Sequence, residues 1–307
     1  MKSKNYGLPK ELNARYPCQL YEKIEYTEFW NENAKHNLDL LERAIVRSLL
    51  PASGHRSVDI GCGFGRLADC YLDRFEQVIM LDGSMTLLQQ AQKAVGERAI
   101  YIAADANHLP LRSSSMDCAL LIRVFHHLQD PQAIMNETQR ILVHKGFFIF
   151  NYCNKQNLRQ MILWILRITR NNPLTLDPVG LGTLFISHHP QYVDRLLRQN
   201  GYLDMKYLGA GVFDKIPDPS GRLLPLAKLL APLWGLTKLA PWITCRAVGS
   251  MEKVLDAGRE EDIFICPSCR GDLIHWPGGA YTCKACGSSF PTKNGIIDFR
   301  MDTNESF

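Results

Sequence analysis

The sequence predicts a doubly wound α/β fold followed by a small metal-binding module. Short, nearly continuous apolar runs recur through the first half of the chain, and they are rich in branched and aromatic residues. Such runs suit strands that helices cover on both faces. Between them, apolar residues recur three and four positions apart, which is the spacing of one helix face. Two C-x-x-C pairs near the end of the chain have the spacing of a metal site.

The predicted strands alternate with predicted helices. Strands are expected at residues 57–61, 77–82, 99–105, 117–124 and 146–153. Helical spacing is found at 67–75, 85–95 and 130–143. In the last of these, Asp130 supplies an N-cap and Pro131 a first-turn proline. This alternation predicts a parallel sheet.

The alternation breaks after Cys153. A basic amphipathic segment at 158–170 leads through a loop and the "SHHP" sequence (187–190) to a helix at 190–201 and a strand at 202–210. We expect the histidine pair at the entry of that helix. A second apolar insertion covers about 220–241, and 242–248 is predicted as the final strand. The insertions are compatible with a membrane-surface helix, with a tunnel for an apolar substrate, or with helices that enlarge the core.

Composition narrows the class of protein. The chain has 307 residues, 46% of them hydrophobic and 21% charged, which are ordinary globular values and exclude a fibrous or disordered class. It lacks an apolar run of about 18 residues and an apolar N-terminal stretch, so a cytoplasmic location is expected. The net charge of +4 is too small to indicate nucleic-acid binding by itself. Basic residues gather in the second half of the main domain, where a solvated helix face or an anionic partner would explain them.

A glycine-rich loop follows the first predicted strand in "SVDIGCGFGR" (57–66). Gly61, Gly63 and Gly65 allow positive φ and leave room for a ligand against the backbone. The dinucleotide fingerprint spaces its glycines G-x-G-x-x-G, whereas this loop reads G-x-G-x-G. The difference favours a ligand without a pyrophosphate.

Acidic residues stand at or near the ends of three predicted strands. Asp82 closes the second strand, where its carboxylate can accept bonds from two ribose hydroxyls. Asp105 closes the third and can accept from an adenine amine, while Asp59 precedes the glycine loop and can order it or meet a ligand amine. Each residue alone also suits a helix cap or a turn.

Several motifs together resemble class I S-adenosylmethionine (AdoMet)-dependent methyltransferases: "VDIGCGFGR", "VIMLDGS", "AADANHLPLRSSSMDCALLIRVFHHLQDP" and "RILVHKGFFIF". The "FHHLQDP" and "LP" signatures are similar to those of the branch with quinone and other small-molecule enzymes. The resemblance implies a Rossmann-like, seven-stranded sheet with an antiparallel last strand. It also implies a cofactor-binding set of Asp59, Gly61, Cys62, Gly63, Gly65, Asp82, Gly83, Asp105, Ala106 and Arg123.

In this fold the residues just beyond the fourth strand line the transferring methyl group. Methyl transfer from a sulfonium is an in-line displacement, so alignment and exclusion of water matter most. His126 or His127 could remove a proton from the acceptor, or one of them could merely cap the turn. Arg123 could hold an anionic acceptor or form a local salt bridge. The predicted catalytic set is therefore His126, His127 and Arg123.

The cysteine module predicts a structural zinc site. Two pairs of thiolates separated by thirteen residues can close tetrahedrally around one ion, and they leave no position for water. The predicted ligands are Cys266, Cys269, Cys283 and Cys286. The segment resembles zinc ribbons of small activator subunits of translation-related methyltransferases, so it could bind a partner protein, stabilise the catalytic domain or contact nucleic acid.

The sequence therefore predicts an N-terminal extension (1–34), a methyltransferase domain (35–250) with insertions at about 154–189 and 220–241, a linker (251–262) and a zinc ribbon (263–300). The expected activity is AdoMet-dependent methyl transfer to a small-molecule or lipidic acceptor. One alternative is an RNA or protein methyltransferase that uses the ribbon for recognition, although nucleic acid is the less favoured partner. The other is a non-catalytic AdoMet-binding scaffold. A protein partner at the ribbon and peripheral membrane contact are also left open.

Overall fold

A computed structural model describes residues 33–181, 185–214, 216, 218, 220–250, 263–277 and 279–301, and the side chains of 33–35 and 181 are not described. Most of the predicted N-terminal extension and the linker at 251–262 therefore lie outside the described residues. The chain divides into two compact units. One holds the described residues of 1–50, 122–131 and 149–247, and the other those of 51–121, 132–148 and 248–307.

The second unit contains parallel strands that match the first four predicted ones. They are β1 (Gly54–Ile60), β2 (Phe75–Asp82), β3 (Ile100–Ala103) and β4 (Met116–Leu121). β1 lies between β2 and β4, and β2 pairs with β3 in register from Ile79 opposite Ile100. Val58, Ile60 and Ile79 in this sheet are fully buried, which explains why the runs are apolar on both faces.

The connections of this unit differ in helical content. α4 (Met85–Val95) begins at Ser84, whose hydroxyl accepts from the Leu87 N–H, and α5 (Pro131–Ile141) begins at the predicted proline. The 3₁₀ turn η2 (Gly96–Arg98) follows α4. Residues 67–75, however, do not form the predicted α-helix, because after the glycine loop the backbone folds by i→i−3 bonds into turns around the 3₁₀ segment η1 (Ala68–Cys70).

The C-terminal segment adds strands that the sequence did not predict. β10 (Leu273–His275), β11 (Tyr281–Cys283) and β12 (Ser289–Phe290) form a separate antiparallel sheet. β13 (Thr292–Lys293) then pairs with β14 (Ile296–Asp298), and β14 lies parallel to β3. The Phe299 N–H continues this pairing by donating to Ala103 O at 2.8 Å. The end of the chain therefore covers the edge of β3.

The first unit contains the remaining elements. Its helices are α3 (Asn33–Leu49), the 3₁₀ turn η3 (Phe125–His127), α6 (Leu158–Ile165), α7 (Pro190–Gln199) and α8 (Leu224–Thr237). Its strands are the end of β5 (Leu142–Cys153), the pair β6 (Val179–Leu181) and β7 (Phe185–Ser187), and β8 (Tyr202–Ala210) and β9 (Trp242–Gly249). α8 packs tightly on β8, since a Cβ atom at Gly235 would lie 2.2 Å from Tyr207 O.

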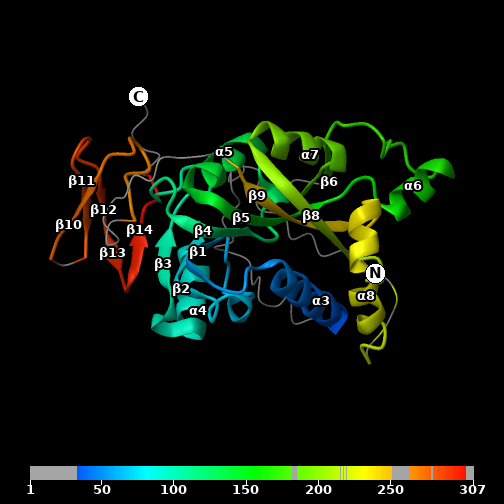
Figure 1. Ribbon diagram of the computed structural model, residues 1–307, viewed down its shortest axis with the longest axis horizontal. Helices are drawn as coiled ribbons and strands as arrows, with labels where there is room; N and C mark the ends of the chain where they lie inside the picture. Colours follow the sequence, from blue (N-terminus) through cyan, green and yellow to red (C-terminus); the bar gives the residue numbers. More distant parts are fainter. Residues whose placement is uncertain are drawn as a thin grey trace. The chain divides into compact units, whose positions relative to one another are not determined.

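Within the second unit the strands of the main sheet are hydrogen-bonded in the order β13-β14-β3-β2-β1-β4 (Figure 1). The predicted α/β class with a parallel sheet is confirmed, and the predicted seven strands gain two at the β3 edge. Within the described residues, no helix is both long enough and apolar enough to cross a membrane.

Candidate functional site

The glycine loop has the conformation that its sequence requires. Gly61, Gly63 and Gly65 have φ values of 75°, 56° and 81°, in the left-handed region that favours glycine. Gly65 also lies close to its neighbours, because a Cβ atom there would approach Met80 Cε to 3.2 Å. The Gly63 N–H donates to Asp82 Oδ2 at 2.8 Å. The loop is therefore fixed to the carboxyl end of the next strand.

Asp82 is the residue that joins the glycine loop to α4. Its Oδ1 accepts from the Ser84 N–H at 2.8 Å while Oδ2 accepts from Gly63, so the lone-pair sites of the carboxylate are not all used. Burial raises the pKa of Asp82, and the N–H groups of Ser84, Gly63 and Gly83 partly offset that effect. The carboxylate is thus held in position with acceptor capacity to spare.

Asp59 is a buried carboxyl group at the end of β1. The Tyr71 hydroxyl donates to its Oδ2 at 2.7 Å. Burial, together with the nearby charge of Asp82, raises the pKa of Asp59 to about 6 despite the tyrosine. The ionised form is therefore costly in this position, and a cation close to it would be stabilising. Burial also raises the pKa of the neighbouring Cys62 thiol, so this cysteine is not an activated nucleophile.

Asp105 accepts a hydrogen bond within its own turn, which is one of the two roles that the sequence predicts for it. Its Oδ1 accepts from the Asn107 N–H at 2.9 Å, and Oδ2 lies 3.2 Å from His108 Nδ1. Ala106 beside it is buried. The carboxylate is half-exposed, so a turn and a ligand contact are compatible here.

Arg123 forms a local ion pair, as one of the two sequence-based interpretations expected. It has a left-handed φ of 65°, which is uncommon for a residue other than glycine. Its N–H donates to Asn151 Oδ1 at 2.7 Å, and its Nε lies 2.6 Å from Glu42 Oε1. The guanidinium stacks on the Trp242 ring at 3.6 Å. These contacts hold both the backbone and the side chain in one arrangement.

The two histidines of η3 lie among aromatic rings. His126 is buried and stacks on Phe185, with ring centroids 4.7 Å apart and an angle of 5° between the planes. The Trp242 ring approaches its edge at 5.1 Å, and His127 lies 4.0 Å away. Burial holds the pKa of His126 well below its usual range, and the nearby His127 and Arg123 add to the effect. His126 is therefore a neutral imidazole at physiological pH.

A third histidine, which the sequence analysis did not single out as a site residue, belongs to this group. His188 is buried against Phe125 at 5.1 Å and Tyr192 at 5.7 Å, and burial lowers its pKa to about 4. Neither of its ring nitrogens has a hydrogen-bond partner among the described residues. The expected helix entry is provided by His189, whose Nδ1 accepts from the Gln191 N–H at the start of α7. The burial of His188 depends on tertiary contacts, so the sequence carried no signal for it.

Comparison with known proteins assigns this part of the chain. Residues 58–150 match the family described as "Methyltransferase domain". This part of the chain is therefore similar to a methyltransferase domain. Relatives include a ubiquinone biosynthesis O-methyltransferase of Paracidovorax citrulli, 26% identical over 43% of this chain and 57% of that protein. A malonyl-[acyl-carrier protein] O-methyltransferase of Geobacter sulfurreducens is 33% identical over 34% of this chain and 42% of that protein. The chain thus spans about half the length of these curated relatives.

A solved structure extends the likeness in fold. A SAM-dependent methyltransferase from Thermotoga maritima has a TM-score of 0.53 and 19% identity, and the match covers 76% of this chain and 99% of that one. At this identity the likeness concerns the fold. The glycine loop, Asp59, Asp82 and Asp105 all lie within residues 58–150 of the methyltransferase domain, as do Arg123, His126 and His127. Their roles toward a cofactor or an acceptor stay predictions.

The predicted zinc ligands come together outside the methyltransferase domain. Their sulfur atoms lie within 4.8 Å of one another. Sulfurs about 3.8 Å apart are expected when four thiolates surround zinc tetrahedrally at about 2.3 Å, and two of the pairs are 3.7 and 3.4 Å apart. The Ala285 N–H donates to a thiol sulfur at 3.4 Å, and a Cβ at Gly271 would approach that sulfur to 3.2 Å. The donor set is compatible with zinc and consists of Cys266, Cys269, Cys283 and Cys286.

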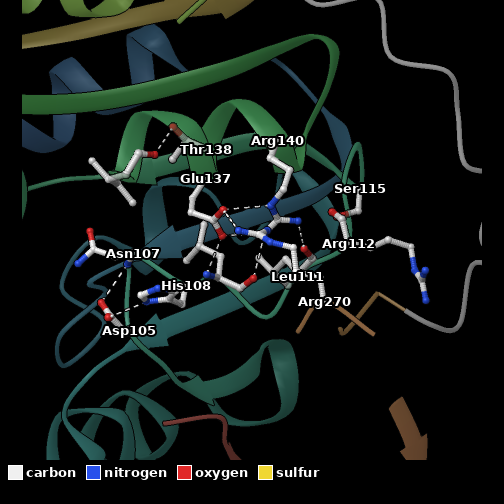
Figure 2. Close-up of polar contacts among 12 residues, drawn as sticks. Asp105, Asn107, His108, Leu111, Arg112, Ser115, Glu137, Thr138, Arg140 and Arg270 are labelled. Carbon is white, nitrogen blue, oxygen red and sulfur yellow. Dashed lines mark hydrogen bonds and ion pairs between the residues drawn. The ribbon is translucent and has the colours of Figure 1, made fainter. Parts of the chain in front are cut away.

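A buried acidic residue joins this cysteine cluster to the methyltransferase domain. Figure 2 shows Glu137 of α5 between Arg140 and Arg270. Its Oε2 accepts from the Leu109 N–H at 2.9 Å and lies 2.8 Å from Arg140 Nη2, while its Oε1 lies 2.7 Å from Arg270 Nη2. Arg140 also donates to the carbonyl groups of Leu109 and Leu111. Arg270 directly follows Cys269, the second of the predicted zinc ligands, so this ion pair fixes the first C-x-x-C turn.

The backbone adds further contacts between the same two segments. Ile265 N donates to Pro110 O at 3.1 Å, and Arg112 N donates to Ile263 O at 2.9 Å. The Arg112 side chain forms an ion pair with Asp272 at 2.9 Å. The segment that follows Asp105 is thus held by the cysteine module over several residues. The sequence did not predict these contacts.

Proposed function

We propose that the protein is an AdoMet-dependent methyltransferase that acts on a small-molecule or lipidic acceptor. The observation that carries this proposal is the fixed arrangement of the glycine loop on Asp82 within the methyltransferase domain. Three glycines at positive φ leave the backbone open, and Asp82 keeps acceptor capacity beyond its backbone partners. A ribose hydroxyl could donate to the acceptor capacity that remains on this carboxylate.

The methionine end of AdoMet suits Asp59. The pKa of this carboxyl is raised to about 6 by burial, although Tyr71 and the charge of Arg66 lower it in part, so a further cation beside it would stabilise the ionised form. The ammonium group of AdoMet is the cation that would stabilise it. In this proposal Asp105 and Ala106 receive the adenine, since the carboxylate of Asp105 is half-exposed.

The transfer step needs little proton chemistry from the protein. The acceptor's lone pair forms a bond to the methyl carbon while the sulfonium–carbon bond breaks, and S-adenosylhomocysteine leaves. A neutral acceptor then loses one proton, to water or to a histidine. His126 and His188 are neutral but weakly basic because burial lowers the pKa of each. Such histidines suit an acceptor that is already acidic.

The names of two relatives describe O-methyltransferases. One is a ubiquinone biosynthesis O-methyltransferase and the other a malonyl-[acyl-carrier protein] O-methyltransferase. For the present chain we propose a small or lipidic acceptor on this basis, together with the apolar surroundings of His126. Arg123 is assigned a positioning role, because Glu42 and Trp242 already hold its guanidinium.

We also propose that the four clustered cysteines bind one structural zinc ion. Four thiolates would complete a tetrahedral site, which leaves no coordination position for a substrate. The ion would hold the two C-x-x-C turns, including Arg270, and so support the contacts of the module with residues 109–112. The zinc is thus assigned to folding of the module, with no part in the transfer step.

Transfer of label from isotope-labelled AdoMet tests the proposed activity. The zinc-loaded protein is incubated with fractionated small molecules and lipids, with RNA and with protein. Label is expected in the small-molecule or lipid fraction, and the Asp82→Ala variant is expected to transfer much less. Label that reaches RNA or protein alone would contradict the proposed acceptor. Tight AdoMet binding without any transfer would instead indicate a scaffold.

A further inference from the structure

The outer face of α8 exposes large apolar side chains. The helix turns its small residues toward β8, where Ala227, Ala231 and Gly235 are buried. Its leucines point the other way, and Leu229 and Leu236 are 76% and 80% exposed. A surface helix normally buries its large apolar side chains and exposes polar ones. An outward leucine face therefore indicates a non-aqueous partner.

A second exposed apolar stretch begins beside the end of α8. The Leu158 N–H at the start of α6 donates to Leu239 O at 2.9 Å, just after α8 ends. At the other end of α6 and in the turn after it, Ile165, Leu166 and Ile168 are each more than 60% exposed. Figure 1 shows α6 and α8 at the same end of the first unit. We call the outward face of these two segments the α6–α8 surface.

The charges of these segments all have one sign. Residues 154–176 and 220–250 contain no Asp or Glu. Their exposed basic residues include Arg167, Arg170 and Lys228, which stand among the exposed apolar residues. An apolar surface with basic residues and no acidic ones is complementary to anionic headgroups above a hydrocarbon layer.

We propose that the α6–α8 surface docks on an anionic lipid bilayer. The leucines and isoleucines enter the interface between headgroups and acyl chains, and the arginines and Lys228 lie at the phosphate level. A second copy of this chain fits the surface less well. In a two-fold dimer the same patch faces itself, which would bring basic residues against basic residues. The proposal does not depend on methyl transfer.

Vesicle co-sedimentation of the full-length, zinc-loaded protein tests this proposal. We expect binding to phosphatidylcholine vesicles that contain phosphatidylglycerol, and weak binding to phosphatidylcholine alone. In about 1 M salt, where the Debye length is about 3 Å, binding to the anionic vesicles should fall. The Leu229→Gln/Leu236→Gln variant should partition at least about tenfold less. Arg167→Gln/Arg170→Gln should also partition at least about tenfold less, since each basic residue contributes about fivefold.

Leu203→Gln is the matched control, because Leu203 is a 53% exposed leucine on β8 outside the surface. It should partition like the native protein. Failure to bind anionic vesicles would overturn the proposal, as would equal losses in the control. A change of oligomeric state in the leucine variant would show that a second copy covers the face. A clear fall in the unfolding temperature of the leucine variant would show that other residues of the same chain cover the face.

Discussion

Removal of zinc is expected to unfold the cysteine module and to expose the edge of β3. In isolated zinc modules the bound ion contributes about 10 kcal/mol or more to folding, and a module of this size has little core to replace it. Loss of the ion releases the turn that carries Arg270, and β14 follows the same module in the chain. Hydrogen exchange should therefore become faster in β10 to β14 and at Ile100–Ala103.

Two variants make this experiment specific. Cys283→Ser should lose the ion, as measured by the zinc content of the purified protein, and should show the same faster exchange as chelated native protein. Cys153→Ser is the control, since this free, half-buried cysteine lies outside the cluster. It should keep one zinc ion per chain. Unchanged exchange at Ile100–Ala103 in zinc-free protein would contradict the supporting role of the ion.

Replacement of Glu137 with glutamine is expected to cost about 3 kcal/mol of unfolding free energy. The side chain of Glu137 is buried. Glutamine has no negative charge, so two guanidinium groups lose the anion that they share. The cost should lie at the lower end for a buried ion pair, because Arg270 is half-exposed and can turn to water. Urea unfolding at neutral pH measures the difference, and Glu97→Gln at an exposed position should change stability by less than about 0.5 kcal/mol.

The same pair of variants gives a pH dependence with a definite sign. Burial alone would raise the pKa of Glu137, but the hydrogen bonds and charges of Arg140 and Arg270 outweigh it, so the pKa lies below 4.5. A lowered pKa means that the ionised carboxylate stabilises the folded state above pH 4.5. The advantage of the native protein over Glu137→Gln should thus shrink as the pH falls below that value. An advantage that is unchanged down to pH 3 would contradict the assigned ion pairs.

Local features of the fold could be predicted because local residues determine them. The glycines at 61, 63 and 65 have no Cβ atom, and all three adopt positive φ. The apolar runs that end at Ile60 and Asp82 form buried parallel strands, as two-sided burial requires. The prediction of a helix at 67–75 was wrong, because the spacing of buried residues in this segment also fits a series of tight turns.

The missed features depend on contacts between distant residues. β14 has only three residues, too few for a periodic pattern, and its partner β3 lies almost 200 positions earlier. Glu137 and Arg270 are 133 positions apart, and nothing in either segment indicates the other. His188 became a member of the aromatic group only through its burial against Phe125. Sequence patterns predict which residues are buried but not which of them meet.

Calorimetric titration of AdoMet into the zinc-loaded protein tests the central claim most directly. The fixed glycine loop and the remaining acceptor capacity of Asp82 predict saturable heat at one site per chain. Asp82→Ala should bind about ten to a hundred times more weakly, which corresponds to about 1.5–3 kcal/mol for bonds to a charged group. If a folded Asp82→Ala variant bound AdoMet with the affinity of the native protein, the assigned contact would be contradicted. No heat from AdoMet or S-adenosylhomocysteine with the native protein would contradict the account as a whole.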